Sequence, residues 1–136
     1  MYLFFDLFRR DPDITYIDEG EYLFQEGEPC LDRMFVLVSG TAEVLVGDSQ
    51  VEIATAGTIL GEMALVERRE ARSASVRALT RCGFAVISEK RFHFLVTEAP
   101  QFAIEVMRIL AQRLRRVDQC IALGEFHGEY PRAGAY

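Results

Sequence analysis

Two short segments carry the residues most suited to binding chemistry. Residues 61–65 read Gly-Glu-Met-Ala-Leu and residues 72–76 read Arg-Ser-Ala-Ser-Val. They place a carboxylate, Glu62, and a guanidinium, Arg72, ten positions apart among small residues, with a mostly charged loop over residues 66–71 between them. A small sugar phosphate requires an anion partner, a hydroxyl partner and room for close approach. The pattern therefore predicts that the loop brings both ends over one pocket.

The two charged side chains suit different parts of such a ligand. Arg72 can meet a phosphodiester with paired, charge-assisted hydrogen bonds, each contributing about 1.5–3 kcal/mol where water is excluded, and Ser73 adds a hydroxyl donor. A helical turn over residues 62–66 would point its first amides at the anion, and Gly61 would allow close approach. Glu62 repels a phosphate and needs a neutral hydroxyl, such as a ribose 2′-hydroxyl. The alternative is a surface ion pair between Glu62 and Arg72 without function.

Together, the two segments resemble the phosphate-binding cassette of cyclic nucleotide-binding domains, with a spacing similar to that of the bacterial catabolite activator family. The likeness extends to residues 20–28 and 34–40 and covers about residues 14–121. It implies a domain that binds a cyclic nucleotide without a further cofactor. We expect cAMP in preference, and cGMP is the open alternative.

The resemblance also implies roles for individual residues. Arg72 would hold the cyclic phosphate with Ser73 and the amide of Ala64, while Glu62 would accept a hydrogen bond from the ribose 2′-hydroxyl and Gly61 would allow close approach. The other ligand-site residues that it implies lie in the cassette, in the strands around the base and on a C-terminal helix: Met63, Val44, Val51, Val117 and Asp118. Val117 has no polar side-chain group and Asp118 departs from the family's hydroxyl residue, so the choice between adenine and guanine stays open.

The elements that position these residues can be read from hydrophobic periodicity. Short runs with a period of two predict strands, with glycines between them at turns. The runs are residues 14–16, 22–24, 34–38, 44–46, 51–53, 76–78 and 84–86. Many short strands at this spacing predict a closed or sandwiched antiparallel structure. Periodicity alone does not separate a cyclic-nucleotide β-roll from a cupin-like barrel, whereas the cassette does. The predicted class is α+β, mainly β: a jelly-roll-like antiparallel β-roll with a short N-terminal helix and two C-terminal helices.

The period changes after residue 87. Ser88 is a candidate N-cap, and Pro100 can open a second, longer helix to about Leu123, with Gly124 as a stop signal. Apolar residues recur along this helix at heptad-like spacing: Ala103, Met107, Leu110, Leu114, Val117 and Ile121. An adjacent apolar face, with Phe102, Val106 and Ile109, can pack on the β domain. The seam predicts either a homodimer through paired helices or one amphipathic helix docked within the chain.

We divide the chain into one domain over residues 1–136: an N-terminal helical segment over 1–13, the β-roll over 14–87, the C-terminal helices over 88–123 and a tail over 124–136. The formal charge of −6 argues against generic binding to nucleic acid. Four arginines of the long helix are expected to form a solvated face: Arg108, Arg113, Arg115 and Arg116. The tail is too short for a helix-turn-helix domain, so we expect no DNA reading by this chain.

Other chemistries have weaker support. The apolar N-terminus is too short to span a bilayer, and three cysteines at unpatterned spacings are typical of reduced thiols in the cytoplasm. With His93 and His127 the only histidines, we expect no metal site and no enzyme. The main hypothesis is therefore a cytoplasmic cyclic-nucleotide sensor that acts on a protein partner in trans or through its own dimerisation. The alternative is a ligand-free interaction module with the same fold, and a metal-dependent cupin-like enzyme is a distant third.

Overall fold

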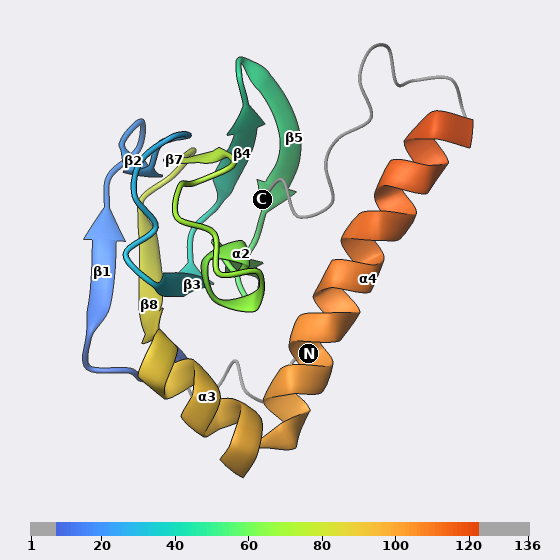
Figure 1. Ribbon diagram of the computed structural model, residues 1–136. Helices are drawn as coiled ribbons and strands as arrows, with labels where there is room; N and C mark the ends of the chain where they lie inside the picture. Colours follow the sequence, from blue (N-terminus) through green and yellow to red (C-terminus); the bar gives the residue numbers. More distant parts are fainter. Residues whose placement is uncertain (1–7, 123–136) are drawn as a thin grey trace.

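The computed structural model describes residues 8–122 of the 136, with side chains through residue 119. Within this range eight strands are followed by two helices, and one short helix interrupts the strands (Figure 1). The strands are β1 (Ile14–Ile17), β2 (Tyr22–Phe24), β3 (Arg33–Ser39), β4 (Ala42–Val46), β5 (Ser49–Ala54), β6 (Ile59–Leu60), β7 (Ser75–Ala78) and β8 (Cys82–Ser88). The helices are α2 (Met63–Val66), α3 (Glu89–Glu98) and α4 (Pro100–Ala122).

The strands form two four-stranded sheets in which every pairing is antiparallel. One sheet has the order β1-β8-β3-β6 and the other has the order β2-β7-β4-β5. The predicted β-roll is confirmed, and the seven predicted runs all lie within strands. Sequence periodicity missed β6, because a strand of two residues is too short to show alternation.

Strand β3 shows why two core clusters form. Its alternate side chains are buried on opposite faces of the sheet: Met34 and Val36 belong to a cluster with the helices, and Phe35 and Leu37 to a cluster with the second sheet. The first sheet is therefore covered on one face by helices and on the other by the second sheet. This arrangement leaves five consecutive residues of β3 buried, as expected of a strand between two layers.

The two long helices begin where the sequence predicts. The Ser88 hydroxyl accepts a hydrogen bond from the Arg91 amide at 3.2 Å and caps α3. Ala99 leaves the helical conformation, with φ −133° and ψ 74°, and Pro100 follows as the first residue of α4. Figure 1 shows α3 beneath the end of the roll and α4 rising beside it.

The face of α4 that packs on the roll is the predicted one. Phe102, Val106 and Ile109 are all at most 5% exposed and join the cluster that covers the first sheet. On the predicted seam, Met107 and Leu114 are 59% and 56% exposed. The seam is therefore an accessible apolar stripe in this single chain, separate from the packed face.

The N-terminal segment is described only from Phe8, whose side chain is fully buried against Phe102 with ring centroids 6.2 Å apart. A helical turn at residues 8 and 9 ends before Asp11, which pairs with Arg91 at 2.6 Å. The rest of the predicted N-terminal helix, Gly124 and the tail lie outside the described residues, as does the side chain of Ile121.

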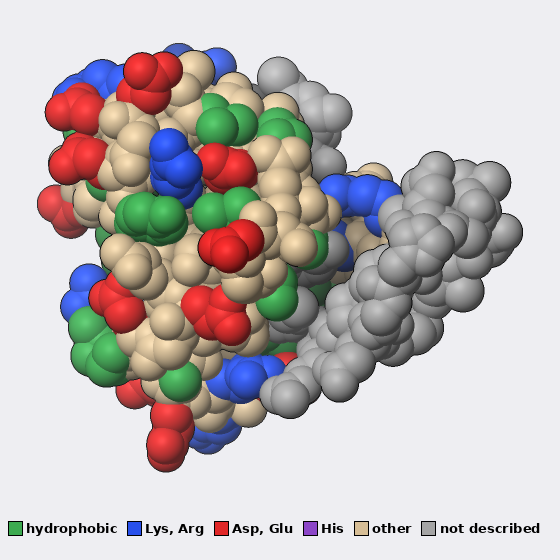
Figure 2. Space-filling model, turned by 90° about the horizontal axis from the view of Figure 1, so that it is seen from above, with side chains coloured by type: hydrophobic (Ala, Val, Ile, Leu, Met, Phe, Trp, Pro, Cys, Tyr) green, Lys and Arg blue, Asp and Glu red, His purple; other side chains and the backbone are tan. Residues whose placement is uncertain are grey.

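The helices within residues 8–122 do not combine the length and apolar composition that a membrane span requires. On the face seen in Figure 2, acidic and basic side chains are interspersed.

Candidate functional site

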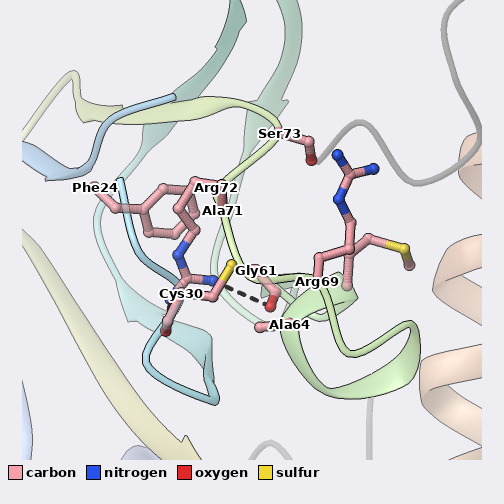
Figure 3. A pocket seen from close by; sticks show the side chains of 9 residues that line it. Phe24, Cys30, Gly61, Ala64, Arg69, Ala71, Arg72 and Ser73 are labelled. Carbon is pink, nitrogen blue, oxygen red and sulfur yellow. Dashed lines mark hydrogen bonds between the residues drawn. The ribbon is translucent and has the colours of Figure 1, made fainter. Parts of the chain in front are cut away.

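The two predicted segments meet around a small, open pocket (Figure 3). The chain reaches it from β6, turns through α2 and the charged loop, and leaves into β7. The pocket is lined by Gly61, Met63, Ala64, Arg72 and Ser73 from the predicted site, and by Phe24, Cys30, Arg69 and Ala71. The structure thus brings together five of the ten predicted site residues.

Arg72 is anchored inside the protein. Its side chain is only 6% exposed, and its Nη2 donates to the carbonyl oxygens of Cys30 at 2.9 Å and Arg33 at 3.0 Å. Its Nη1 donates to the carbonyl oxygen of Gly61 at 3.3 Å, the contact drawn in Figure 3. Arg72 therefore fastens the loop before β3 to the start of the cassette.

The guanidinium also lies over aromatic rings. Its carbon is 4.2 Å from the centre of the Phe24 ring and 5.6 Å from that of Phe35, within the range of cation–π attraction. Burial lowers the pKa of Arg72, and the nearby Cys30 and Glu62 oppose that shift. Its buried Nε has no hydrogen-bond acceptor among the described residues. One donor of this side chain is thus unsatisfied.

Gly61 permits a close approach, and the group that approaches it is Arg72. Gly61 has a φ of +73°, a left-handed conformation that favours glycine. A Cβ built there would lie 2.5 Å from Nη1 of Arg72 and 3.4 Å from the Phe24 ring. The predicted need for glycine is therefore explained by packing against the predicted phosphate-binding side chain.

Glu62 is fully buried and faces α4. Its Oε1 accepts a hydrogen bond from Nη1 of Arg113 at 2.8 Å, while its Oε2 has no donor among the described residues. Burial raises the pKa of Glu62, and the charge of Arg113 opposes this shift. Since Glu62 and Arg72 are both buried and bound to other groups, the alternative of a surface ion pair between them is wrong.

Arg113 was missed by sequence reasoning. The prediction that it belongs to a solvated face is wrong, because its side chain is 3% exposed and lies between Glu62 and Glu52 of β5. Its Nε and Nη2 donate to the two oxygens of Glu52 at 3.0 and 3.1 Å, and Nη2 also donates to the carbonyl of Ile59 at 2.6 Å. Arg113 follows the buried Ile109 by four positions, and this spacing was the available signal.

The remaining predicted residues lie in other places. Val44 is a fully buried core residue and Val51 is partly buried against the same cluster. On α4, Val117 is half-buried and Asp118 is exposed, and neither lines the pocket. The amide of Ala64 already donates to the carbonyl of Gly61 at 3.2 Å. Ligand contacts of these residues stay predictions.

The family comparisons match this architecture. The profile described as cyclic nucleotide-binding domain matches residues 14–99. Over 100 residues the chain is 34% identical to the cAMP-activated global transcriptional regulator CRP of Escherichia coli O6:H1, with 70% of this chain and 46% of that protein covered. The chain thus spans about half the length of such curated relatives.

Two solved structures resemble the fold closely. A cyclic nucleotide-binding domain from Methylobacillus flagellatus has a TM-score of 0.71 at 25% identity, covering 85% of this chain and 68% of that one. The catabolite activator protein of Thermus thermophilus also has a TM-score of 0.71, at 22% identity, covering 88% of this chain and 58% of that one. The second likeness concerns the fold alone.

Proposed function

The chain belongs to the cyclic nucleotide-binding domain family, and we propose that its ligand is cAMP and that it acts as a sensor or regulatory domain. The observation that carries this proposal is a pair of buried, unsatisfied atoms. Among the described residues, the buried side-chain polar atoms without a partner are Nε of Arg72, Oε2 of Glu62 and Oε2 of Glu105. Two of these three belong to the residues expected to bind the phosphate and the ribose.

The chemistry of the two atoms matches the ligand. Nε of Arg72 is a cationic donor beside the pocket, and a cyclic phosphate supplies an anionic acceptor. Oε2 of Glu62 is an acceptor, and a ribose 2′-hydroxyl supplies a donor. A buried unsatisfied atom costs about 1–3 kcal/mol. A ligand that satisfies both would recover part of that cost, which supports binding at this cassette.

The preference for cAMP rests on the relatives. The regulator from E. coli is named for its activation by cAMP, and it is 34% identical to this chain over 100 residues. Among the described residues that line the pocket, we identify no side chain placed to form a pair of hydrogen bonds with guanine that adenine could not form. Binding of cGMP is therefore the competing outcome of the same experiment.

Isothermal titration calorimetry with cAMP and with cGMP tests the proposal. We expect the wild type to bind cAMP more tightly, Arg72→Ala to lose binding, and Arg77→Ala to bind as the wild type does. Arg77 is a matched control because it lies on β7, five positions from Arg72, and is exposed. Circular dichroism checks that Arg72→Ala is folded, and Ser73→Ala supplies a milder variant. If neither cAMP nor cGMP produces heat of binding, the alternative of a ligand-free interaction module would be favoured.

We also propose that the chain forms a homodimer through α4. The proposal is supported by the exposed Met107 and Leu114, with Leu110 half-buried between them on the predicted seam. Sedimentation equilibrium should show a dimer for the wild type and a monomer for Leu114→Glu. Gln112→Glu is the control, because Gln112 is an exposed polar residue of α4 outside the seam. A wild-type monomer at all concentrations would refute the dimer.

A regulatory role without catalysis and a cytoplasmic location complete the proposal. The buried Cys30 and Cys82 are free thiols, which is typical of a reducing compartment. Incubation of the protein with cAMP, followed by chromatography of the nucleotide, tests the absence of turnover. Recovery of unchanged cAMP is expected, and conversion to another nucleotide would overturn this part of the proposal.

A further inference from the structure

Glu52 is a buried carboxylate that the cassette resemblance does not assign. It lies on β5, is 6% exposed and faces Arg113 of α4. We propose that Glu52 is a positioning residue. It binds Nε and Nη2 of Arg113 and thereby leaves Oε2 of Glu62 available to accept a hydrogen bond from a ligand hydroxyl. This inference rests on the proposed function, in which that hydroxyl is the ribose 2′-hydroxyl.

The contacts divide Arg113 unequally between the two carboxylates. Glu52 accepts two hydrogen bonds from Nε and Nη2, at 3.0 and 3.1 Å. Glu62 accepts through Oε1 alone, from Nη1 at 2.8 Å. A planar guanidinium favours bidentate hydrogen bonding to one carboxylate, and here that carboxylate is Glu52. Glu62 therefore keeps one buried oxygen without a donor.

Charge balance explains why this arrangement is tolerated in the interior. Glu52 and Glu62 carry two negative charges, and Arg113 supplies one positive charge between them. Arg116 supplies a second, with its Nη1 3.3 Å from Oε1 of Glu52. The four side chains are neutral as a group, so Arg113 can serve two carboxylates at once. Without Glu52, Glu62 would be the one carboxylate in contact with Arg113 among the described side chains.

The substitution Glu52→Gln should change how Arg113 is shared. Glutamine keeps the volume and one oxygen, but it removes the charge and places an amide donor opposite an arginine donor. Arg113 would then donate hydrogen bonds to both carboxylate oxygens of Glu62, including Oε2. A ligand hydroxyl would have to compete for an oxygen that is already satisfied. Glu52→Gln should therefore weaken the hydrogen bond between the ligand hydroxyl and Glu62, and it should leave the other contacts of the ligand unchanged.

Calorimetry with cAMP and 2′-deoxy-cAMP isolates that contact. In the wild type, a hydrogen bond to the Glu62 carboxylate contributes about 1.5–3 kcal/mol, so removal of the 2′-hydroxyl should weaken binding by about 10-fold to 150-fold. In Glu52→Gln this ratio should fall to about threefold or less, mainly through weaker binding of cAMP. Glu43→Gln is the control, because Glu43 is a half-buried carboxylate of the neighbouring β4 that pairs with Arg77. It should keep the wild-type ratio.

A merely structural role would give a different result. If Glu52→Gln weakens both nucleotides equally and keeps the wild-type ratio, the inference is overturned. A second readout needs no ligand: carbon NMR of the Glu62 carboxyl should show its pKa lowered in Glu52→Gln, because Arg113 moves closer and a like charge is lost. An unchanged or raised pKa would contradict the inference. Should Glu52→Gln fail to fold, Glu52→Asp, which shortens the reach to Arg113, replaces it in the calorimetric measurement.

The same titrations separate this inference from the proposed function. A wild type that binds neither nucleotide refutes the proposed function, and the carboxyl pKa then still decides whether Glu52 controls Arg113. A wild type that binds both nucleotides equally refutes the hydroxyl contact of Glu62, and with it the inference, while leaving cyclic-nucleotide binding intact.

Discussion

Replacement of Arg72 by alanine should destabilise the domain even without a ligand. The side chain is 6% exposed and donates to the carbonyl oxygens of Cys30, Arg33 and Gly61. Two of these contacts, at 2.9 and 3.0 Å, have good hydrogen-bond lengths. Arg72→Ala removes all three and also the ring contact with Phe24 at 4.2 Å.

The magnitude follows from opposing effects. Hydrogen bonds that involve a charged group contribute about 1.5–3 kcal/mol each, and a cation–π contact about 0.5–2 kcal/mol. The burial of the guanidinium, which lowers the pKa of Arg72, offsets much of that gain. We therefore expect a net loss of about 2–4 kcal/mol in the free energy of unfolding, a large part of the stability of a small domain.

Urea unfolding without nucleotide, followed by circular dichroism, measures this loss. Arg77→Ala should lose about 0.5 kcal/mol or less, because Arg77 is an exposed residue in a distant ion pair with Glu43 at 3.9 Å. Arg72→Lys should fall between the two, since one ammonium cannot bridge carbonyl groups from two segments. An Arg72→Ala variant as stable as the wild type would show that the arginine contributes to ligand binding alone, contrary to this reasoning.

Three further predictions concern single residues. Gly61→Ala should lower both the free energy of unfolding, by about 1–3 kcal/mol, and the calorimetric affinity for cAMP, because its Cβ would lie 2.5 Å from Nη1 of Arg72; unchanged values would refute this. Leu31→Gly should stabilise the domain by about 0.5–1 kcal/mol in urea, because Leu31 has a φ of +55° and is 67% exposed; a loss of stability would count against strain. The pKa of Glu62 is higher in the folded protein than its ordinary value of 4.5 in the unfolded chain. The contribution of Glu62 to stability is therefore greatest below pH 4.5 and is lost as the pH rises through the raised pKa. Glu62→Gln should therefore gain stability relative to the wild type as the pH rises above 4.5 in urea unfolding, with Arg113 and Glu52 as the facing charges; a relative loss with rising pH would contradict the raised pKa.

The fold could be predicted from sequence because its signals are local. Alternation in strands such as β3 and β8, the Ser88 cap and the Pro100 start each depend on neighbouring residues. The cassette was also local, since Gly61 and Arg72 are separated by a short loop. Local patterns of this kind specify type and position of elements. They do not specify partners from distant segments.

The partners of the two cassette charges come from such distant segments. Arg72 binds carbonyl groups 39 and 42 positions away, and Glu62 binds an arginine 51 positions away. The sequence therefore indicates which residues carry charge, but it does not indicate that the Arg72 side chain binds backbone carbonyl groups of Cys30 and Arg33. Four arginines on one helix of an acidic chain predict a solvated face, but Arg113 follows the buried Ile109 by four positions and is itself buried. A buried arginine between two carboxylates satisfies both observations.

The anchoring of Arg72 also connects the proposed site with the start of α3. The two carbonyl groups on its Nη2 bracket a turn in which Leu31 and Asp32 have φ values of +55° and +51°, conformations that cost about 1–2 kcal/mol per residue. The carbonyl of Asp32 accepts a hydrogen bond from the Glu89 amide at 3.1 Å, at the first residue of α3. A phosphate that drew Arg72 away from this turn would release its strain next to α3. Phosphate binding at the proposed site would therefore be linked to the position of α3 through a few backbone hydrogen bonds, without any requirement for movement of the sheets.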